Sequence, residues 1–364
     1  MEEKMNQEND IQKYFNKHGT IHTSAPCRLD VSGTWDLPQF ALPFRNAHPN
    51  TTNIALDLRT HCCVSQDDEG VIAVSDDWNR EVQPADSPRY DGPFGLVHAI
   101  ASYFGVDSIS IKFGYEAPPK SGLGGSGVLG VVTIAALNEL TDSQLSLGEI
   151  AYLAHQIEDG LRFSYTGMQD QCAAAFGGVN SWTWDYGNMN VNLPFWRKSV
   201  LSEGAYPGLE KRLVVAYTGK SHNSSDVNVR QVAGFFDGSA RPQWLRINEI
   251  GSEFAYALKE LDWEKAGKLI TEEHLIRCDL VPERRTETAK TLQDIALKNG
   301  SAGFATTGAG KGGCVWALAA NSDEATRIRA EWNGALAGLP LPEAKILPVK
   351  IARQGLVVET KTLS

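Results

Sequence analysis

The sequence lacks the marks of a secreted, membrane-spanning or nucleic-acid-binding protein. Its six cysteines form no Cys-x-x-Cys pair, and the adjacent Cys62 and Cys63 are a poor basis for a disulfide framework, so we expect reduced thiols in a cytoplasm. The first residues are too polar for a signal peptide, and no apolar run is long enough to span a membrane. The net charge of −10 argues against a general nucleic-acid surface.

Two common nucleotide-binding signatures are also missing. A P-loop has a glycine five residues before its Gly-Lys pair and a Ser or Thr directly after it. Gly310-Lys311 has Ala305 and Gly312 at these positions, and Gly219-Lys220 has Val214 in place of the first glycine. The His-Arg-Asp and Asp-Phe-Gly motifs of protein kinases do not occur. Gly-x-Gly-x-x-Gly does occur at residues 122–127. Pro118 and Pro119 precede it, however, where a dinucleotide-binding motif should follow directly from a strand.

The chain is long enough for two domains with a mixed α/β architecture. It has 364 residues, of which 42% are hydrophobic and 21% are charged, as in an ordinary globular protein. Residues 213–217 (LVVAY) predict a buried strand, and we place the domain boundary shortly before it. The predicted domains are residues 1–204 and 205–364.

Residues 118–127 (PPKSGLGGSG) predict an anion-binding loop. They lie between an alternating strand at 109–113 and an Ala/Val/Leu-rich helix at 128–140. Four glycines in six residues let a backbone approach phosphates at the start of a helix, and the hydroxyls of Ser121 and Ser126 and the Lys120 cation suit the same ligand. A loop that only packs a helix on a sheet is the alternative.

Several charged residues admit a structural or a functional interpretation from the residues alone. Arg28, beside Asp30 and Asp36 near an interrupted strand, is typical of a structural ion pair. Asp170, between Gln169 and Gln171, either caps a helix or holds a substrate hydroxyl. Glu158 lies near the end of a helix that opens with the capping box of Ser146 and Glu149, where a lone glutamate is usually solvated.

Three separated segments together resemble the GHMP kinases. They are APCRLDVSGTWD near the N-terminus, PPKSGLGGSG in the middle and TTGAGKGGCVWAL near the C-terminus, and they stand in the order found in that family. The resemblance covers roughly residues 20–360. It implies an α/β (α+β) fold of two domains with the active site in the cleft between them.

Within that family the sequence looks most like the branch of fucokinases and heptose-phosphate kinases. RLDVSGTWD, GMQDQCAAAFGG and LVVAYTGKS carry this likeness. It implies that Asp170 is the catalytic acid, that Arg28 lies near the transferring phosphate, and that Glu158 and Ser126 hold the metal. It also implies that the nucleotide contacts Lys120, Ser121, Gly122, Leu123, Gly124, Gly125, Ser126 and Gly127, and that the substrate contacts Trp35, Asp36, Gln169, Gly308, Gly310 and Lys311.

The resemblance implies an ATP- and Mg²⁺-dependent kinase of a sugar hydroxyl, most simply the anomeric one, yielding a sugar 1-phosphate. The expected partner is a small sugar or sugar phosphate, with no nucleic acid and no membrane; the sequence does not indicate an oligomeric state. A kinase of galactose, mevalonate or homoserine type and a catalytically idle sugar or nucleotide sensor stay open. Gly125, Lys311 and a shortened first motif depart from the family pattern and affect the identity of the substrate most.

Overall fold

The computed structural model describes residues 2–75, 80–84, 87–161, 165, 167–188, 192–221 and 225–361. Its strands are β1 (Thr20–Val31), β2 (Asn50–Gln66), β3 (Val71–Ser75), β4 (Glu81–Gln83), β5 (Ile109–Tyr115), β6 (Val179–Trp184), β7 (Phe195–Ser199), β8 (Leu213–Tyr217), β9 (Ser301–Thr306), β10 (Cys314–Ala319), β11 (Lys345–Leu347) and β12 (Val357–Lys361).

The α-helices are α1 (Glu2–His18), α2 (Pro38–Ala41), α3 (Gly95–Phe104), α4 (Gly125–Leu140), α5 (Leu147–Gly160), α6 (Gln169–Phe176), α7 (Tyr206–Glu210), α8 (Ser225–Phe236), α9 (Arg241–Lys259), α10 (Trp263–Leu280), α11 (Glu287–Lys298) and α12 (Ser322–Ala337). Short 3₁₀ turns are η1 (Arg45–Ala47), η2 (Glu203–Ala205) and η3 (Pro282–Arg284). No helix in this described part of the chain is both long and apolar enough to cross a bilayer.

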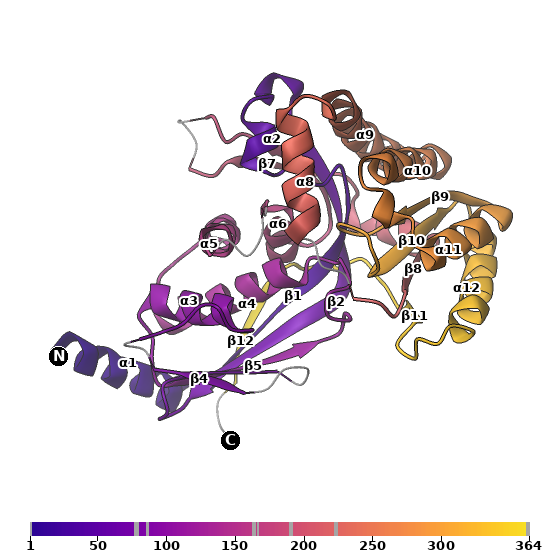
Figure 1. The fold of residues 1–364 in the computed structure, drawn as a ribbon. Coiled ribbons are helices and arrows are strands. Elements are labelled where there is room, and N and C mark those ends of the chain that lie inside the picture. Colours follow the sequence, from indigo (N-terminus) through magenta and orange to yellow (C-terminus); the bar gives the residue numbers. More distant parts are fainter. Residues whose placement is uncertain are drawn as a thin grey trace.

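The strands form two separate sheets, each covered by helices (Figure 1). The larger sheet has the order β12-β1-β2-β5-β3-β4, and β6 and β7 extend it from the first half of the long strand β2. Helix α4 packs on β1 and β2, with α3, α5 and α6 beside it. The smaller sheet has the order β11-β8-β10-β9, with α10 and α11 against β9 and α12 against β8.

The predicted boundary between residues 204 and 205 falls between β7 in the larger sheet and β8 in the smaller one. The C-terminal strand β12 nevertheless returns to the larger sheet, where it pairs antiparallel with β1. A single cut in the chain therefore does not separate the two sheets, because the last strand of the chain belongs to the N-terminal domain.

Two local expectations were wrong. Pro26 predicts a turn that interrupts the strand before Arg28, but β1 runs through this proline with only a register shift between Pro26 and Cys27. The shift accommodates the missing N–H of the proline. The prolines at 38, 43 and 49 predict a loop over residues 38–50, but this segment contains α2 and η1. Pro38 occupies the first turn of α2, where a missing N–H is tolerated.

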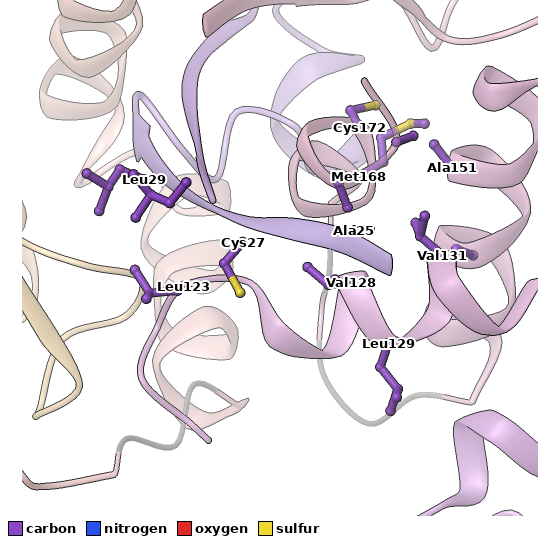
Figure 2. Close-up of a cluster of buried hydrophobic side chains, with 14 of the residues drawn as sticks. Ala25, Cys27, Leu29, Leu123, Val128, Leu129, Val131, Ala151, Met168 and Cys172 are labelled. Carbon is purple, nitrogen blue, oxygen red and sulfur yellow. The ribbon is translucent and has the colours of Figure 1, made fainter. Parts of the chain in front are cut away.

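The core of the larger domain lies directly behind the segments that carry the predicted site. All residues from 127 to 137 of α4 are buried, as expected for a helix that is apolar on every side. Figure 2 shows apolar side chains of β1, α4, α5, α6 and the loop before α4 meeting there, among them Cys27, Leu123, Val128, Ala151 and Cys172. This packing holds the first turns of α4 and α6 against β1.

Candidate active site

A cavity of about 750 Å³ lies between the two domains, each of which contains one of the sheets. The larger domain contributes the end of β1, the loop before α4, the end of α5 and the start of α6. The other domain contributes Gln231 of α8, Arg277 of α10, and Gly308 and Ala309 of the loop after β9. The cavity therefore brings together all three of the segments that the sequence singles out.

The predicted phosphate loop forms one wall of this cavity. Gly124 precedes α4 with a φ of +85°, and no side chain caps the helix, so the first-turn N–H groups lack intrahelical acceptors. Such groups, at the positive end of the helix dipole, are a site for phosphate oxygens. The lining residues of the loop are Lys120, Ser121, Gly122, Gly124, Gly125 and Ser126.

Two of the predicted loop residues face the protein interior instead. Leu123 is buried in the core, and its carbonyl oxygen accepts a hydrogen bond from the backbone N–H of Arg28 at 3.1 Å. A Cβ at Gly127 would lie 2.8 Å from Cβ of Asp170, so this glycine lets α4 and α6 approach each other. These two residues shape the loop without lining the cavity.

Arg28 and Asp170 form a buried ion pair at the junction of the two helices. Nε of Arg28 lies 2.7 Å from Oδ1 of Asp170, and Nη1 donates to the carbonyl of Gly122 at 2.8 Å. Nη1 is also 3.0 Å from Oδ1 of Asp30. One guanidinium thus fixes the catalytic candidate, the phosphate loop and a second cavity carboxylate. Burial lowers the pKa of Arg28, but the neighbouring carboxylates outweigh it and raise the pKa overall.

Glu158 and Ser126, the predicted metal ligands, lie together on the cavity wall. Glu158 is only 5% exposed, so the expectation of a solvated helical glutamate was wrong. Burial raises its pKa to about 7 against opposing hydrogen bonds from Ser126 and Gln171. Nε2 of Gln171 donates to its Oε2 at 2.7 Å. The carboxylate is held by its neighbours.

This pair fits a magnesium ion in part. Hydroxyl and carboxylate oxygens are the hard donors that Mg²⁺ takes, and the ion usually keeps waters and substrate phosphates as further ligands. Within the described ranges no group of three or more His, Cys, Asp or Glu side chains is arranged to hold a metal. An ion here would therefore depend on a nucleotide to complete its shell.

The predicted substrate residues of the first motif separate into two groups. Asp36 lines the cavity, and its Oδ2 accepts the first backbone N–H of α6, from Gln169, at 3.0 Å. Burial raises the pKa of Asp36 to about 7. Gln169 also lines the cavity. Trp35 does not: it is 0% exposed and donates its indole N–H to the carbonyl of Trp244 at 2.9 Å.

The second glycine loop touches the first one directly. The backbone N–H of Cys314 and the hydroxyl of Thr307 both donate to the carbonyl of Ser121, at 2.7 and 3.0 Å. Of the predicted residues here, Gly308 lines the cavity, whereas Gly310 and Lys311 do not. A Cβ at Gly310 would lie 2.6 Å from the side chain of Arg284, which explains a glycine there without a ligand.

Sequence reasoning left out several lining residues. Asp30 and Gln171 stand inside motifs that the sequence singled out, so their positions could have been included. Thr34 lies in the same N-terminal motif. Gln231 and Arg277 carry no local signal, because only the packing of α8 and α10 onto the other domain brings them to the cavity.

Comparison with known proteins agrees with these observations. Residues 93–178 match the family of GHMP kinases N terminal domains, and residues 254–338 match the GHMP kinases C terminal family. The first match contains the phosphate loop, Glu158 and Asp170; the second contains the second glycine loop. Arg28 and Asp36 lie upstream of both.

Curated relatives and solved structures cover most of the chain. A D-glycero-alpha-D-manno-heptose 7-phosphate kinase of Campylobacter jejuni is 26% identical over 82% of this chain and 88% of its own length. A mevalonate kinase of Thermococcus sibiricus is 27% identical over 69% of each chain. The crystal structure of a D-glycero-D-manno-heptose 1-phosphate kinase of Bacteroides thetaiotaomicron superposes with a TM-score of 0.71 at 19% identity, covering 94% of this chain and 100% of that one.

The matched domains, their order and the shared two-domain fold confirm the architecture expected from the motifs. Residues 93–178 and 254–338 therefore carry the N- and C-terminal domains of GHMP kinases, and the relatives of the chain include a sugar-phosphate kinase.

Proposed function

We propose that this protein transfers the γ-phosphoryl group of ATP, with Mg²⁺, to a sugar hydroxyl, the anomeric one, to give a sugar 1-phosphate. The observation that carries the proposal is the buried pair of Arg28 and Asp170 beside the uncapped start of α4. An anion site and an anchored carboxylate then face one cavity, as in-line phosphoryl transfer requires.

Different residues of the chain bind the nucleotide, accept the proton and stabilise the charge of the transferring group. The N–H groups of Gly125 and Ser126 and the side chain of Lys120 hold the nucleotide phosphates. Asp170 accepts the proton of the attacking sugar hydroxyl. The hydroxyl oxygen forms a bond to the γ-phosphorus while the bond from that phosphorus to ADP breaks and ADP leaves. Arg28 offsets negative charge at that point. Glu158 and Ser126 would hold Mg²⁺, which when bound neutralises charge on the phosphates.

The composition of the cavity favours a polyhydroxylated substrate over mevalonate. Asp30, Asp36, Thr34 and Gln169 line the cavity, and such side chains accept hydrogen bonds from hydroxyls. Mevalonate carries its own carboxylate, which two cavity carboxylates would repel. Mevalonate stays the second candidate because a mevalonate kinase matches 69% of the chain.

The cellular setting that we propose is a cytoplasm. All six cysteines are free thiols, and five of them are buried. Such unpaired thiols are typical of proteins kept under reducing conditions.

The deciding experiment measures ADP release from ATP and Mg²⁺ against hexoses, heptoses, their phosphates, mevalonate and homoserine. We expect turnover with a reducing sugar or sugar phosphate, and a product that has lost its reducing end and shows a new phosphorus resonance. Phosphate on another hydroxyl would contradict the anomeric assignment, and turnover of mevalonate alone would favour the second candidate. ATP binding with no turnover of any acceptor would point to an idle sensor.

A further inference from the structure

The loop that joins β1 to α2 adopts a conformation that its own residues disfavour. Ser32 has a φ of 62° and Thr34 a φ of 76°, both in the left-handed region. Non-glycine residues, and β-branched ones above all, persist there only where surrounding contacts enforce it. The loop lies between Asp30 and Asp36, two carboxylates of the cavity.

Strand β2 holds Ser32 through Asn50 and Thr51, and further contacts to this loop come from the other domain. Oε1 of Glu273, on α10, accepts the backbone N–H of Ser32 at 2.8 Å. The same oxygen pairs with Nε of Arg277 at 2.8 Å, and Nη2 of Arg277 donates to the carbonyl of Gly33 at 2.7 Å. Nη1 of Arg277 lies 3.4 Å from the hydroxyl of Thr34.

Helix α9 closes the loop from a second side. A Cβ on Gly251 would lie 2.5 Å from Cβ of Ser32, so this glycine allows α9 to pack directly on the loop. The carbonyl of Trp244 accepts the indole N–H of Trp35, and the guanidinium of Arg277 lies 5.2 Å from the Trp244 ring. Four consecutive residues, 32–35, are thus held by α9 and α10.

Arg277 lines the cavity but is already committed to protein partners. Each of its three nitrogens has a neighbour in Glu273 or in the loop, and the Glu273 and Arg277 side chains are 6% and 8% exposed. A buried ion pair of this kind is strongly destabilised when one partner is removed, because the other charge is left unpaired. This geometry indicates that Arg277 supports the loop and is not a free cation for binding a substrate anion.

Resting on the proposed function, we infer that Glu273 and Arg277 are positioning residues for the sugar. Together they form a brace, meaning the ion pair that fixes residues 32–35 and so places Asp30 and Asp36 toward the substrate. The brace acts on the part of the cavity that Asp30 and Asp36 line. The phosphate loop is held separately, by Cys314 and Thr307 on Ser121.

The test uses the full-length chain with Arg277→Met, Arg277→Lys and Glu273→Gln. We expect faster backbone hydrogen exchange in residues 31–37 of Arg277→Met, and a rise in KM for the best sugar of the acceptor panel of roughly ten- to hundredfold, the range for lost charged hydrogen bonds. Because the phosphate loop is untouched, Kd for ATP by calorimetry should stay within about twofold and kcat should fall less than KM rises. Arg277→Lys, which keeps the positive charge, should have a sugar KM between those of the wild type and Arg277→Met.

Arg246→Met is the matched control. Arg246 on α9 pairs with Glu272 of α10 at 2.7 Å, so the variant removes an ion pair between the same two helices without touching the loop. It should change neither loop exchange nor KM. Melting curves exclude unfolded variants, and Glu273→Gln serves if Arg277→Met does not fold.

The outcomes distinguish a failure of the brace from a failure of the proposed function. A folded Arg277→Met protein with unchanged exchange at residues 31–37 overturns the brace, as does a loosened loop with an unchanged sugar KM. Tighter binding of a sugar phosphate by Glu273→Gln would show that Arg277 is an anion-binding residue instead. If the wild type phosphorylates no sugar, the proposed function fails, while the exchange rates still decide whether the brace exists.

Discussion

Arg28 and Asp170 are separated by 142 residues in the sequence, yet their side chains meet at 2.7 Å between two helix N-termini. The guanidinium is 5% exposed, whereas the carboxylate is 24% exposed and faces the cavity. The ion pair through Oδ1 restricts rotation of the Asp170 carboxylate. A fixed orientation of this kind is what a residue that accepts a substrate proton needs.

The first prediction concerns Asp170→Asn. The variant should fold and bind ATP but turn over about 10²–10⁴ times more slowly, the usual contribution of a positioned acid or base. Arg28 keeps Asp30 as an ionic partner at 3.0 Å, which limits the structural damage. Steady-state kinetics and a melting curve check this, with Asp294→Asn on the exposed side of α11 as the control. Activity within a few-fold of wild type would reduce Asp170 to a helix cap.

Local sequence signals were sufficient for the parts of the site built from contiguous segments. The phosphate loop, the Asp170 segment and the second glycine loop each carry their glycines and polar residues within about a dozen positions, and the structure brings all three to one cavity. Periodicity also predicted β8 and α5 at their observed positions, including the capping box of Ser146 and Glu149.

Long-range packing decided what the sequence could not. Glu158 became a buried carboxylate because α4 and α6 close over α5, and nothing in its own helix indicates this. Trp35 is next to Asp36 in the sequence, but the Trp35 side chain packs in the aromatic core, whereas the Asp36 side chain lines the cavity. Glu273 and Arg277 acquire their contacts only from the docking of α10 on the other domain's loop.

The second prediction concerns pH. Folding raises the pKa of Glu158 from 4.5 and of Asp36 from 3.8, each to about 7. At these two carboxyl groups the native protein therefore binds more protons than the unfolded chain between about pH 4 and 7, so their contribution to the free energy of unfolding decreases as pH rises through that window. Burial lowers the pKa of His274, which acts in the opposite direction, so the carboxyl contribution is measured as the difference in melting temperature between wild type and Glu158→Gln at pH 5 and pH 8 without ligand.

Glu158→Gln tests the origin of that slope. The variant should flatten the pH dependence and melt at pH 8 no lower than wild type, because a neutral amide replaces a buried charge. It should also need more Mg²⁺ for half-maximal rate, since one hard oxygen ligand is lost. An unaltered magnesium dependence would remove Glu158 from the metal site, and an unaltered pH slope would contradict its buried titration.

The third prediction concerns Gly124→Val. Gly124 has a φ of +85°, and a Cβ there would lie 3.0 Å from Cγ of Asp170. Valine would strain the loop and obstruct the phosphates at the start of α4, so calorimetry should detect no ATP binding. Gly334→Val on α12, where a Cβ meets nothing within 4 Å, is the matched control and should bind normally. A folded Gly124→Val protein with normal ATP affinity would remove the nucleotide from this loop.

The last prediction separates Trp35 from Asp36, which the sequence grouped as substrate contacts. Trp35 packs edge-on against Phe40 and Phe235, with ring centroids 5.9 Å away in each case, and lies outside the cavity lining. Trp35→Phe loses the hydrogen bond to Trp244 and some buried area, so we expect a loss of about 1–3 kcal/mol in the free energy of unfolding. The sugar KM should stay within about twofold, since no substrate contact is removed and Glu273 and Arg277 still hold residues 32–34.

Asp36→Asn should show the opposite pattern. An amide of the same shape can still accept the N–H of Gln169, so the melting temperature should change little, and burial of an amide at pH 8 is easier than burial of a carboxylate. The sugar KM should rise by roughly tenfold or more, because a charged acceptor for a hydroxyl is lost. Chemical denaturation and steady-state kinetics on both variants, at pH 8 and saturating ATP, make the comparison. A raised sugar KM in Trp35→Phe with normal stability would return the tryptophan to the substrate site, and an unchanged KM in Asp36→Asn would take the carboxylate out of it.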